Sequence, residues 1–246
     1  MKHIASCSFG KDSLATILLA LEHNEPLDAV VYSEVMFSHT DNISGEYPEH
    51  SEWIHRTAIP NLQSMGVHVD VLKSQKDYIS FFRSAVGGGG KWKGSLYGFP
   101  IGGMCVINRE LKLKPIHQYY HAINDDITQY VGIASDEPKR LARLKGNQTS
   151  LLAKYGYTEA MAKQLCRQHG LLSPIYDNET RGGCWFCPNA RYKSFAQFKL
   201  RHPDLWQRLL DLGKTPNLCS YGFKYGKTIE QVDKKIDAIN NQLSLF

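Results

Sequence analysis

The stretch KHIASCSFGKDSLATILLALE, residues 2–22, decides the fold. Residues 2–7 form a short apolar run, which predicts a buried strand. Residues 8–13 contain serine, glycine and aspartate, which favour a turn. The apolar residues that follow recur at helical spacing: Leu14, Ile17, Leu18 and Leu21. This spacing predicts a helix with one buried stripe, so the chain opens with a strand, a turn and a helix.

The segments that follow continue this alternation. Residues 29–32 and 67–72 predict two more strands, and the helical spacing of residues 46–65 between them is interrupted by Pro60. A fourth strand is predicted at residues 129–134, and further helices at 78–86, 115–123, 158–169, 194–212 and 228–243. Strands that alternate with helices indicate an α/β fold, a doubly wound, Rossmann-like parallel sheet of about five strands.

The character of the sequence changes beyond Pro174, where glycines, a cysteine pair and aromatic residues gather. We therefore expect an α/β domain at residues 1–145. Residues 146–246 are expected to form a smaller helical region that carries the cysteines and packs on the first domain.

The composition of the chain is that of an ordinary globular protein. It has 246 residues, of which 42% are apolar and 22% are charged. These values exclude disorder, collagen and coiled coil as its main character, and no apolar stretch is long enough for a membrane span. The net charge of +5 permits an anionic ligand or a nucleic acid without arguing for either. Six cysteines without an export signal predict cytosolic thiols, so we expect a cytoplasmic protein with no membrane partner.

The turn at residues 8–13 has the chemistry of an anion site. The N-terminus of a helix offers unpaired N–H groups and the positive end of the helix dipole, which suit a phosphate. Gly10 allows close approach of a ligand, Lys11 adds a cation, and Asp12 could cap the helix or hold Mg²⁺. Ser8 and Ser13 add hydroxyls. The alternative is a simple capped turn, and the spacing of a Walker A loop is absent.

The same turn resembles a known motif. Residues 8–13, S-F-G-K-D-S, are similar to the PP-loop S-G-G-x-D-S of the N-type ATP pyrophosphatases. Phe9 replaces the first glycine, as is typical of sulfonucleotide reductases. Further segments resemble the phosphoadenosine phosphosulfate (PAPS) reductase family in the family's order: residues 46–49, Cys105 with residues 111–112 and Pro115, residues 132–138 with Arg140, and residues 183–188.

This resemblance implies that the chain binds an adenine nucleotide. The phosphates would lie on the turn, and the base and ribose near Ser33 and Glu34 at the end of the second strand. The residues implied to bind the nucleotide are Ser8, Phe9, Gly10, Lys11, Asp12, Ser13, Ser33, Glu34, Lys112 and Arg140. Two of them have ordinary alternatives: Lys112 as a solvated lysine, and Arg140 in a surface ion pair with Glu137.

The cysteines predict a metal or redox site. Cys184 and Cys187 form a C-x-x-C pair between glycines and a proline, and Cys105 and Cys219 are the cysteines that could complete a set of four ligands. Four thiolates suit a 4Fe–4S cluster or zinc, and a redox disulfide or inert thiols are further alternatives. The resemblance favours the cluster, although family members carry a second cysteine beside the first and this chain has Val106 there.

The remaining cysteines and aromatic residues have structural interpretations. Cys7 and Cys166 are expected to be small buried side chains of the core. The aromatic residues near the cysteine pair are expected to form a core around it: Trp185, Phe186, Phe195 and Phe198. The glycine-rich loop at residues 87–94 is either a mobile lid or, through Lys91, Trp92 and Lys93, a nucleic-acid contact.

The end of the sequence bears on the reaction. True sulfonucleotide reductases use a cysteine near the C-terminus, and this sequence has none after Cys219, whereas Asp12 and Ser13 match the ATP-using motif. The resemblance therefore implies an enzyme in which Lys11, Asp12 and Ser13 act with Mg²⁺ and ATP to adenylate an acceptor, with sulfur transfer through the cluster. The acceptor would be a nucleic acid or a protein, and a sulfur donor would be needed.

Two other functions remain open. The first is reduction of PAPS or adenylylsulfate (APS) with a thioredoxin-like reductant, through Cys219 or a cysteine of the pair. The second is a non-catalytic subunit that binds a nucleotide or a nucleic acid through the loop at residues 87–94.

Overall fold

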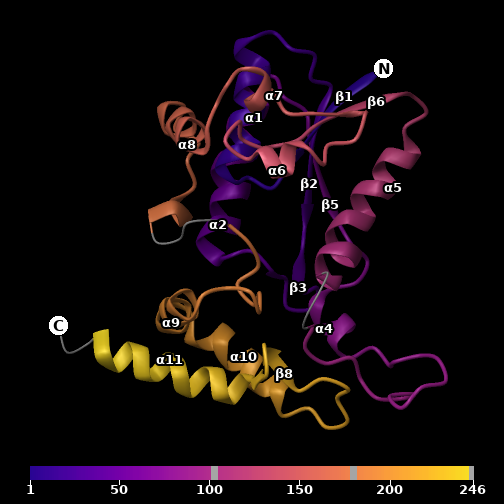
Figure 1. Ribbon diagram of the computed structural model, residues 1–246, viewed down its shortest axis with the longest axis vertical. Coiled ribbons are helices and arrows are strands. Elements are labelled where there is room, and N and C mark those ends of the chain that lie inside the picture. Colours follow the sequence, from indigo (N-terminus) through magenta and orange to yellow (C-terminus); the bar gives the residue numbers. More distant parts are fainter. Residues whose placement is uncertain (101–104, 178–181, 244–246) are drawn as a thin grey trace. The chain divides into compact units, whose positions relative to one another are not determined.

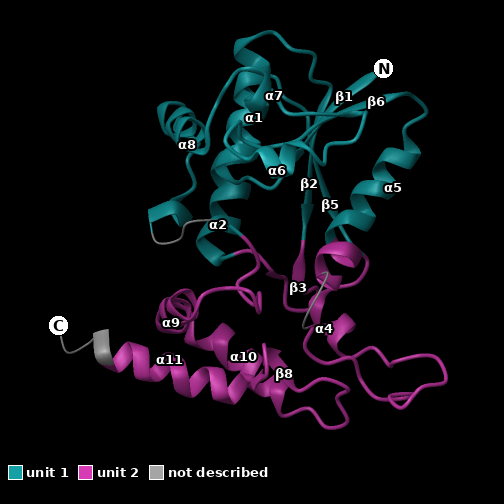
Figure 2. Cartoon of the chain, in the orientation of Figure 1, with its two compact units in different colours: residues 1–34, 47–74, 112–182 teal, residues 35–46, 75–111, 183–246 magenta. Residues whose placement is uncertain are grey.

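The computed structural model describes residues 1–100, 105–177 and 182–243 and divides into two units. Unit 1 comprises residues 1–34, 47–74 and 112–182, and unit 2 comprises residues 35–46, 75–111 and 183–246 (Figure 2). The division differs from the expected boundary at residue 145. Residues 146–182 belong with the N-terminal sheet because they supply one of its strands, and residues 35–46 and 75–111 leave it to join the cysteine-bearing region.

Unit 1 is built on one parallel sheet, which confirms the predicted α/β fold (Figure 1). Its five strands lie in the order β5-β2-β1-β6-β7. Their bounds are β1 Lys2–Cys7, β2 Ala29–Glu34, β5 Val69–Lys73, β6 Ile127–Tyr130 and β7 Gln148–Thr149. The chain proceeds from β1 toward one edge and then returns to β6 on the other side of β1, so the topological switch point lies between β1 and β6.

Helices and helical turns surround this sheet. They are α1 Lys11–Glu22, α2 Pro48–Trp53, the π-helical turn η1 Ile54–Ala58, α3 Ile59–Ser64, α5 Lys114–Ala122, α6 Pro138–Leu141, α7 Leu151–Lys154, α8 Glu159–Gln168 and the 3₁₀ turn η3 Pro174–Asp177. A further π-helical turn, η2 Asn108–Leu113, precedes α5. The expected interruption at Pro60 is present: a π-helical turn ends just before α3, and Pro60 lies in the first turn of α3, where its missing N–H is tolerated.

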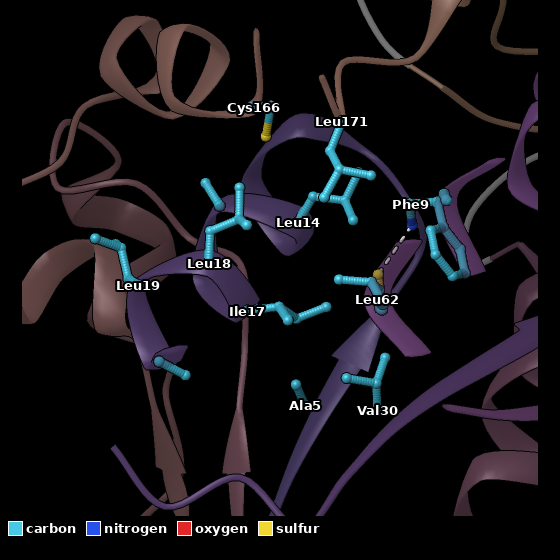
Figure 3. Packing of buried hydrophobic residues seen from close by; sticks show 14 of the residues in the cluster. Ala5, Phe9, Leu14, Ile17, Leu18, Leu19, Val30, Leu62, Cys166 and Leu171 are labelled. Atoms are coloured by element: carbon cyan, nitrogen blue, oxygen red, sulfur yellow. Dashed lines mark hydrogen bonds between the residues drawn. The ribbon is translucent and has the colours of Figure 1, made fainter. Parts of the chain in front are cut away.

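The two faces of the sheet bury different side chains because residues alternate along each strand. Ala5, Cys7 and Val30 face α1, whose Leu14, Ile17 and Leu18 pack on them (Figure 3). Ile4 and Val31 instead pack against Ile116. Ile116 belongs to α5, which lies on the other face of the sheet (Figure 1). Helices on both faces make the sheet doubly wound, and this leaves its carboxyl edge as the place where the loops after β1, β2 and β6 meet.

Unit 2 contains small strand pairs and helices. They are β3 Met36–Ser38, β4 Ile43–Ser44, α4 Tyr78–Phe82, α9 Tyr192–Arg201, α10 Pro203–Gly213, β8 Gly222–Lys224, β9 Lys227–Thr228 and α11 Ile229–Leu243. The single helix expected at residues 194–212 is two helices, because Pro203 cannot donate a backbone hydrogen bond and begins a new one. The helix expected at residues 78–86 ends at Phe82.

The core of unit 2 is aromatic, as expected. Trp185 and Phe198 stack with ring centroids 5.1 Å apart, and Phe37 contacts both Trp185 and Phe186. Phe195 packs against Trp206. These side chains are at most 2% exposed, which confirms that the aromatic residues beside the cysteine pair are core residues. Within the described part of the chain, no helix combines the length and apolarity needed to cross a membrane.

Candidate functional site

The loop between β1 and α1 is shaped by the hydroxyl of Ser13. The Ser13 Oγ accepts a hydrogen bond from the Ser8 backbone N–H at 3.2 Å and donates one to the Gly10 carbonyl oxygen at 3.0 Å. It is 8% exposed, so both bonds form away from bulk water. Ser13, one of the two serines predicted to offer a hydroxyl to a phosphate, therefore holds the turn in shape. Of the two hydroxyls, the one that could touch a ligand is that of Ser8.

Phe9 adopts a backbone conformation that is unusual for its type. Its φ is +55°, in the left-handed region, which costs roughly 1–2 kcal/mol for a residue with a Cβ. Its N–H donates to the Cys7 Sγ at 3.2 Å (Figure 3, dashed line). Its fully buried ring meets Tyr32 edge to face. Strain of this kind is held by its surroundings and concentrates at functional sites. Phe9 thus turns the chain sharply and anchors the loop in the core, while its N–H points inward.

The first amide of α1 already has a hydrogen-bond partner. The Lys11 N–H donates to the Tyr176 hydroxyl oxygen at 2.8 Å. An ideal Cβ on Gly10 would lie 3.2 Å from the same hydroxyl, so the absence of a side chain at Gly10 lets Tyr176 approach. Burial raises the pKa of Tyr176 to about 12, so the phenol is neutral. A phosphate on this amide must replace the phenol oxygen.

The ammonium group of Lys11 lies between carboxylates. Lys11 Nζ is 2.8 Å and 3.0 Å from the two carboxylate oxygens of Asp12, and 3.5 Å from Glu159 Oε1. Burial raises the pKa of Asp12, and Lys11 opposes that rise. Asp12 does not cap the helix, because the cap is Gly10 with no side-chain hydrogen bond. Of the two predicted roles of Asp12, binding a cation is the one compatible with this position.

Gly132, in the loop after β6, packs on the backbone of the loop at residues 8–13 and the start of α1. An ideal Cβ at this position would lie 2.7 Å from Ser13 N and 2.8 Å from Asp12 C, closer than Cβ atoms come to other atoms. The loop after β6 therefore touches the first turn of α1 directly, across the switch point of the sheet. The sequence marks Gly132 only as part of the family resemblance, and the contact explains why the position needs a glycine.

A buried histidine connects the loop to a distant segment. The His50 Nδ1 lies 2.7 Å from the Ser173 Oγ, and the ring also forms a hydrogen bond with the backbone of Ser8. Burial lowers the pKa of His50 to about 4, so the ring is neutral at neutral pH. Residues 173–176 thus hold the loop twice, through His50 and through Tyr176. His50, Ser173 and Tyr176 were not predicted from the sequence, because no spacing relates them to residues 8–13.

A cavity lies at the switch point of the sheet. It has a volume of about 370 Å³, and its lining includes Ser6 of β1, Gly132, Arg140, Arg143, Leu144 and Gln148. Gly132, which packs against Ser13, is one of the lining residues, so the cavity adjoins the loop at residues 8–13 within unit 1. Ligands of doubly wound sheets bind at the carboxyl ends of the strands, at the switch point.

Three other residues implied to bind the nucleotide are either buried or paired with a charged side chain. Ser33 is fully buried, and the Glu34 carboxylate lies 3.1 Å from Lys73 Nζ and 3.2 Å from His55 Nε2. Arg140 makes the ion pair with Glu137 that was the alternative to phosphate binding, at 2.6 Å and 2.7 Å.

Lys112 lies within electrostatic range of the loop. Its positive charge contributes to lowering the pKa of both Cys7 and His50. Burial outweighs this charge at Cys7, where the pKa rises to about 11. Lys112 is therefore near the end of β1, where the resemblance places positive charge for the anion.

The predicted metal ligands all lie in unit 2. Cys184 and Cys187 share one tight turn, in which the Cys187 N–H donates to the Cys184 carbonyl oxygen at 3.0 Å. Burial raises the pKa of Tyr78, and negative charge on Cys184, Cys105 and Cys187 raises it further. The Cys219 thiol instead donates to the Tyr97 carbonyl oxygen at 3.0 Å.

Cysteine thiolates are the ligands that zinc and iron–sulfur clusters use, so these residues suit either group chemically. The turn at residues 184–187 brings two of them together, and Lys224, near Cys187, places a cation where thiolates or a cluster would carry negative charge. Among the described residues, however, no group of three or more cysteine, histidine or acidic side chains is arranged to hold a metal ion. The set of Cys105, Cys184, Cys187 and Cys219 therefore stays a prediction.

Cys7 and Cys166 are core residues, as expected. They are 4% and 0% exposed and belong to the cluster between the sheet and α1. Burial raises the pKa of Cys166 to about 12, so its thiol is neutral, and it donates to the Lys11 carbonyl oxygen at 3.1 Å. Neither thiol is a candidate nucleophile.

Comparison with known proteins adds no assignment. No model of a known protein family matches the chain, and no curated protein matches its sequence.

Proposed function

We propose that the chain binds an adenine nucleotide, with its phosphates on residues 8–13, and that with ATP and Mg²⁺ it adenylates an acceptor oxygen. The observation that carries the proposal is the position of this loop. A strained glycine-containing turn leads into the N-terminus of a 12-residue helix at the switch point of a parallel sheet, and Gly132 packs against it. Backbone N–H groups and the helix dipole favour a phosphate at such a point.

The proposed reaction uses the residues of this loop. The acceptor oxygen attacks the α-phosphorus of ATP, the bond from that phosphorus to the bridging oxygen of the β-phosphate breaks, and pyrophosphate leaves. Lys11 would neutralise the leaving pyrophosphate, and the Asp12 carboxylate, which now contacts Lys11 Nζ at 2.8 Å, would hold Mg²⁺. Ser13 keeps the backbone of the loop in the shape that directs its amides at the phosphates. A sulfur nucleophile then displaces AMP from the adenylated acceptor.

Binding is tested with the Tyr176→Phe variant. The Tyr176 hydroxyl occupies the Lys11 N–H, and phosphate binding must break that bond. A neutral hydrogen bond contributes about 1 kcal/mol net. Without the competing oxygen, ATP should bind about fivefold more tightly to the variant, as measured by titration calorimetry.

The Tyr225→Phe variant is the matched control, because it removes the same atom from a side chain that is 87% exposed. Its affinity for ATP should equal that of the native chain. If ATP gives no heat with the native chain, the proposed function is wrong. If Tyr176→Phe binds ATP no more tightly than Tyr225→Phe, the Lys11 amide is not a phosphate donor.

A 4Fe–4S cluster on the cysteines of unit 2 is the second part of the proposal. Cys184, Cys187 and Cys105 would hold it, with Cys219 as the fourth ligand. When bound, such a cluster supplies a site for sulfur or for electrons. The chain's own contribution is the tight C-x-x-C turn and the cation of Lys224 beside it.

Metal analysis tests this part. The native chain purified without oxygen should be brown and contain iron and sulfide, whereas Cys184→Ser/Cys187→Ser should lose both. Cys166→Ala is the control for the loss of a thiol outside the set and should keep its iron. A colourless protein that contains zinc would show that the cysteines hold zinc and not a cluster. Iron that is retained in the double variant would remove Cys184 and Cys187 from the ligand set.

A second function is favoured by the distribution of charge. Lysine and arginine outnumber the acidic residues in unit 2, whereas the two are nearly equal in unit 1. Trp92 is 46% exposed, and Lys91 Nζ lies 4.9 Å from the centroid of its ring. Basic and aromatic side chains of this kind bind single-stranded nucleic acid. If the chain binds an oligonucleotide in a salt-sensitive way and does not turn over ATP, the result would support nucleic-acid binding and contradict adenylation.

A further inference from the structure

The cavity of unit 1 at the switch point has a chemistry of its own. Two arginines, Arg140 and Arg143, lie on its wall, and among the described residues that line it none is aspartate or glutamate. Arg140 is neutralised by an ion pair with Glu137, in which one guanidinium nitrogen, Nη1, donates to both carboxylate oxygens. The guanidinium of Arg143 has no hydrogen-bond or ion-pair partner among the described residues. The net positive charge at this cavity therefore comes from Arg143.

Ser6 and Gln148 of the cavity lining belong to a row of hydrogen-bonded side chains. The Ser6 Oγ lies 2.8 Å from the Tyr120 hydroxyl and accepts from Gln129 Nε2 at 2.8 Å. Gln148 Nε2 donates to Gln129 Oε1 at 2.9 Å, and Gln148 Oε1 accepts from the Lys145 N–H at 3.1 Å. Both sides of the Gln148 amide are thus fixed, and its second N–H hydrogen remains to donate to a ligand.

A second cavity shows what this one lacks. In unit 2, a cavity of about 340 Å³ is also lined by two arginines, Arg83 and Arg208, but its wall includes Asp41 and Asp211. Arg208 is 2.6 Å from Asp41. Its arginines face carboxylates that would repel an anion, whereas the cavity of unit 1 offers a guanidinium, an amide N–H and a hydroxyl with no lining carboxylate.

We propose that the cavity lined by Ser6, Arg143 and Gln148 is a phosphate-binding subsite, with Arg143 as its charged ligand. An arginine fork, an amide donor and a hydroxyl match the oxygens of a phosphate group. The volume of about 370 Å³ admits more than one phosphate group. The phosphate belongs either to the distal part of a nucleotide on residues 8–13 or to a separate molecule. The subsite itself does not depend on the nucleotide assignment.

The test is a calorimetric titration of the full chain with inorganic pyrophosphate. Arg143→Ala should bind pyrophosphate about tenfold more weakly than the native chain, since it removes a charge-assisted hydrogen bond at an exposed site. Arg143→Lys should recover part of the affinity, because it keeps the charge and loses the fork. Arg83→Ala, which removes the same charge from the other cavity, should bind pyrophosphate like the native chain.

Titrations with ATP and AMP distinguish the two sources. If Arg143→Ala weakens ATP but not AMP, the subsite holds the distal phosphates of the nucleotide. If it leaves ATP unchanged, and pyrophosphate still binds the ATP-loaded chain, the subsite serves a separate molecule. Pyrophosphate binding without ATP binding would refute the proposed function and keep the subsite. Equal pyrophosphate affinity in Arg143→Ala and Arg83→Ala would overturn the subsite.

Discussion

The Asp12→Ala/Ser13→Ala variant is expected to release AMP and pyrophosphate from ATP at least about a hundredfold more slowly than the native chain. In the proposed reaction Asp12 would hold Mg²⁺ at the start of α1, and Ser13 Oγ makes the two hydrogen bonds that shape the loop. Without these side chains the loop would lose its ligand for Mg²⁺, and its backbone amides would no longer be held in a fixed orientation. Chromatographic separation of ATP, AMP and pyrophosphate measures the effect.

The controls separate chemistry from folding. Asp126→Ala/Ser64→Ala makes the same pair of changes at exposed positions of unit 1 and should turn over ATP at the native rate. Asp12→Asn keeps the size of the side chain and the Ser13 bonds, so it should stay folded and lose most of the turnover. Turnover that persists in Asp12→Asn and in the double variant would show that this loop does not carry the reaction.

Gly132→Ala is expected to lower the free energy of unfolding by about 3 kcal/mol and to weaken ATP binding more than tenfold. The added Cβ would lie 2.7 Å from Ser13 N and 2.8 Å from Ser13 Cα. These are backbone atoms, which cannot move aside as the end of a side chain can. The first turn of α1 must therefore shift, and its amides with it. Urea unfolding and titration with ATP measure the two effects.

Gly146→Ala provides the comparison for this change. Nothing lies within 4 Å of a Cβ at Gly146, and neither glycine has a positive φ. Its unfolding free energy should stay within about 0.5 kcal/mol of the native value. Equal stability and equal ATP affinity in the two variants would mean that the loop after β6 does not fix the position of α1.

Local patterns in the sequence were sufficient to predict four of the five strands of the sheet. The fourth lies at Ile127–Tyr130 rather than at residues 129–134, and the two-residue strand β7 was not located. Residues 2–7, 29–32 and 67–72 lie in strands, or within two residues of one, and α1 and α8 agree with the predicted helices. Each of these elements is determined by apolar residues at a fixed period along the chain. The breaks were harder to predict. His202 and Pro203 divide a run of helical spacing into α9 and α10, and the period alone does not show where one helix ends.

The turn at residues 8–13 was predicted for the same reason, because its residues are contiguous and their chemistry can be read from their order. What surrounds the loop depended on the tertiary structure. Tyr176 and His50 reach it through contacts that join segments far apart in the sequence, and the role of Gly132 follows from a clash that only packing reveals.

The sequence by itself determined the parallel α/β sheet, the strand–turn–helix start and the buried roles of Cys7 and Cys166. The tertiary structure alone decided that residues 35–46 and 75–111 join the cysteine region, that Tyr176 occupies the Lys11 amide, and that Arg143 rather than Arg140 leaves its charge uncompensated. The physical reason is range. Backbone periodicity acts between residues a few positions apart, whereas a partner for an amide or a guanidinium is chosen by proximity in space.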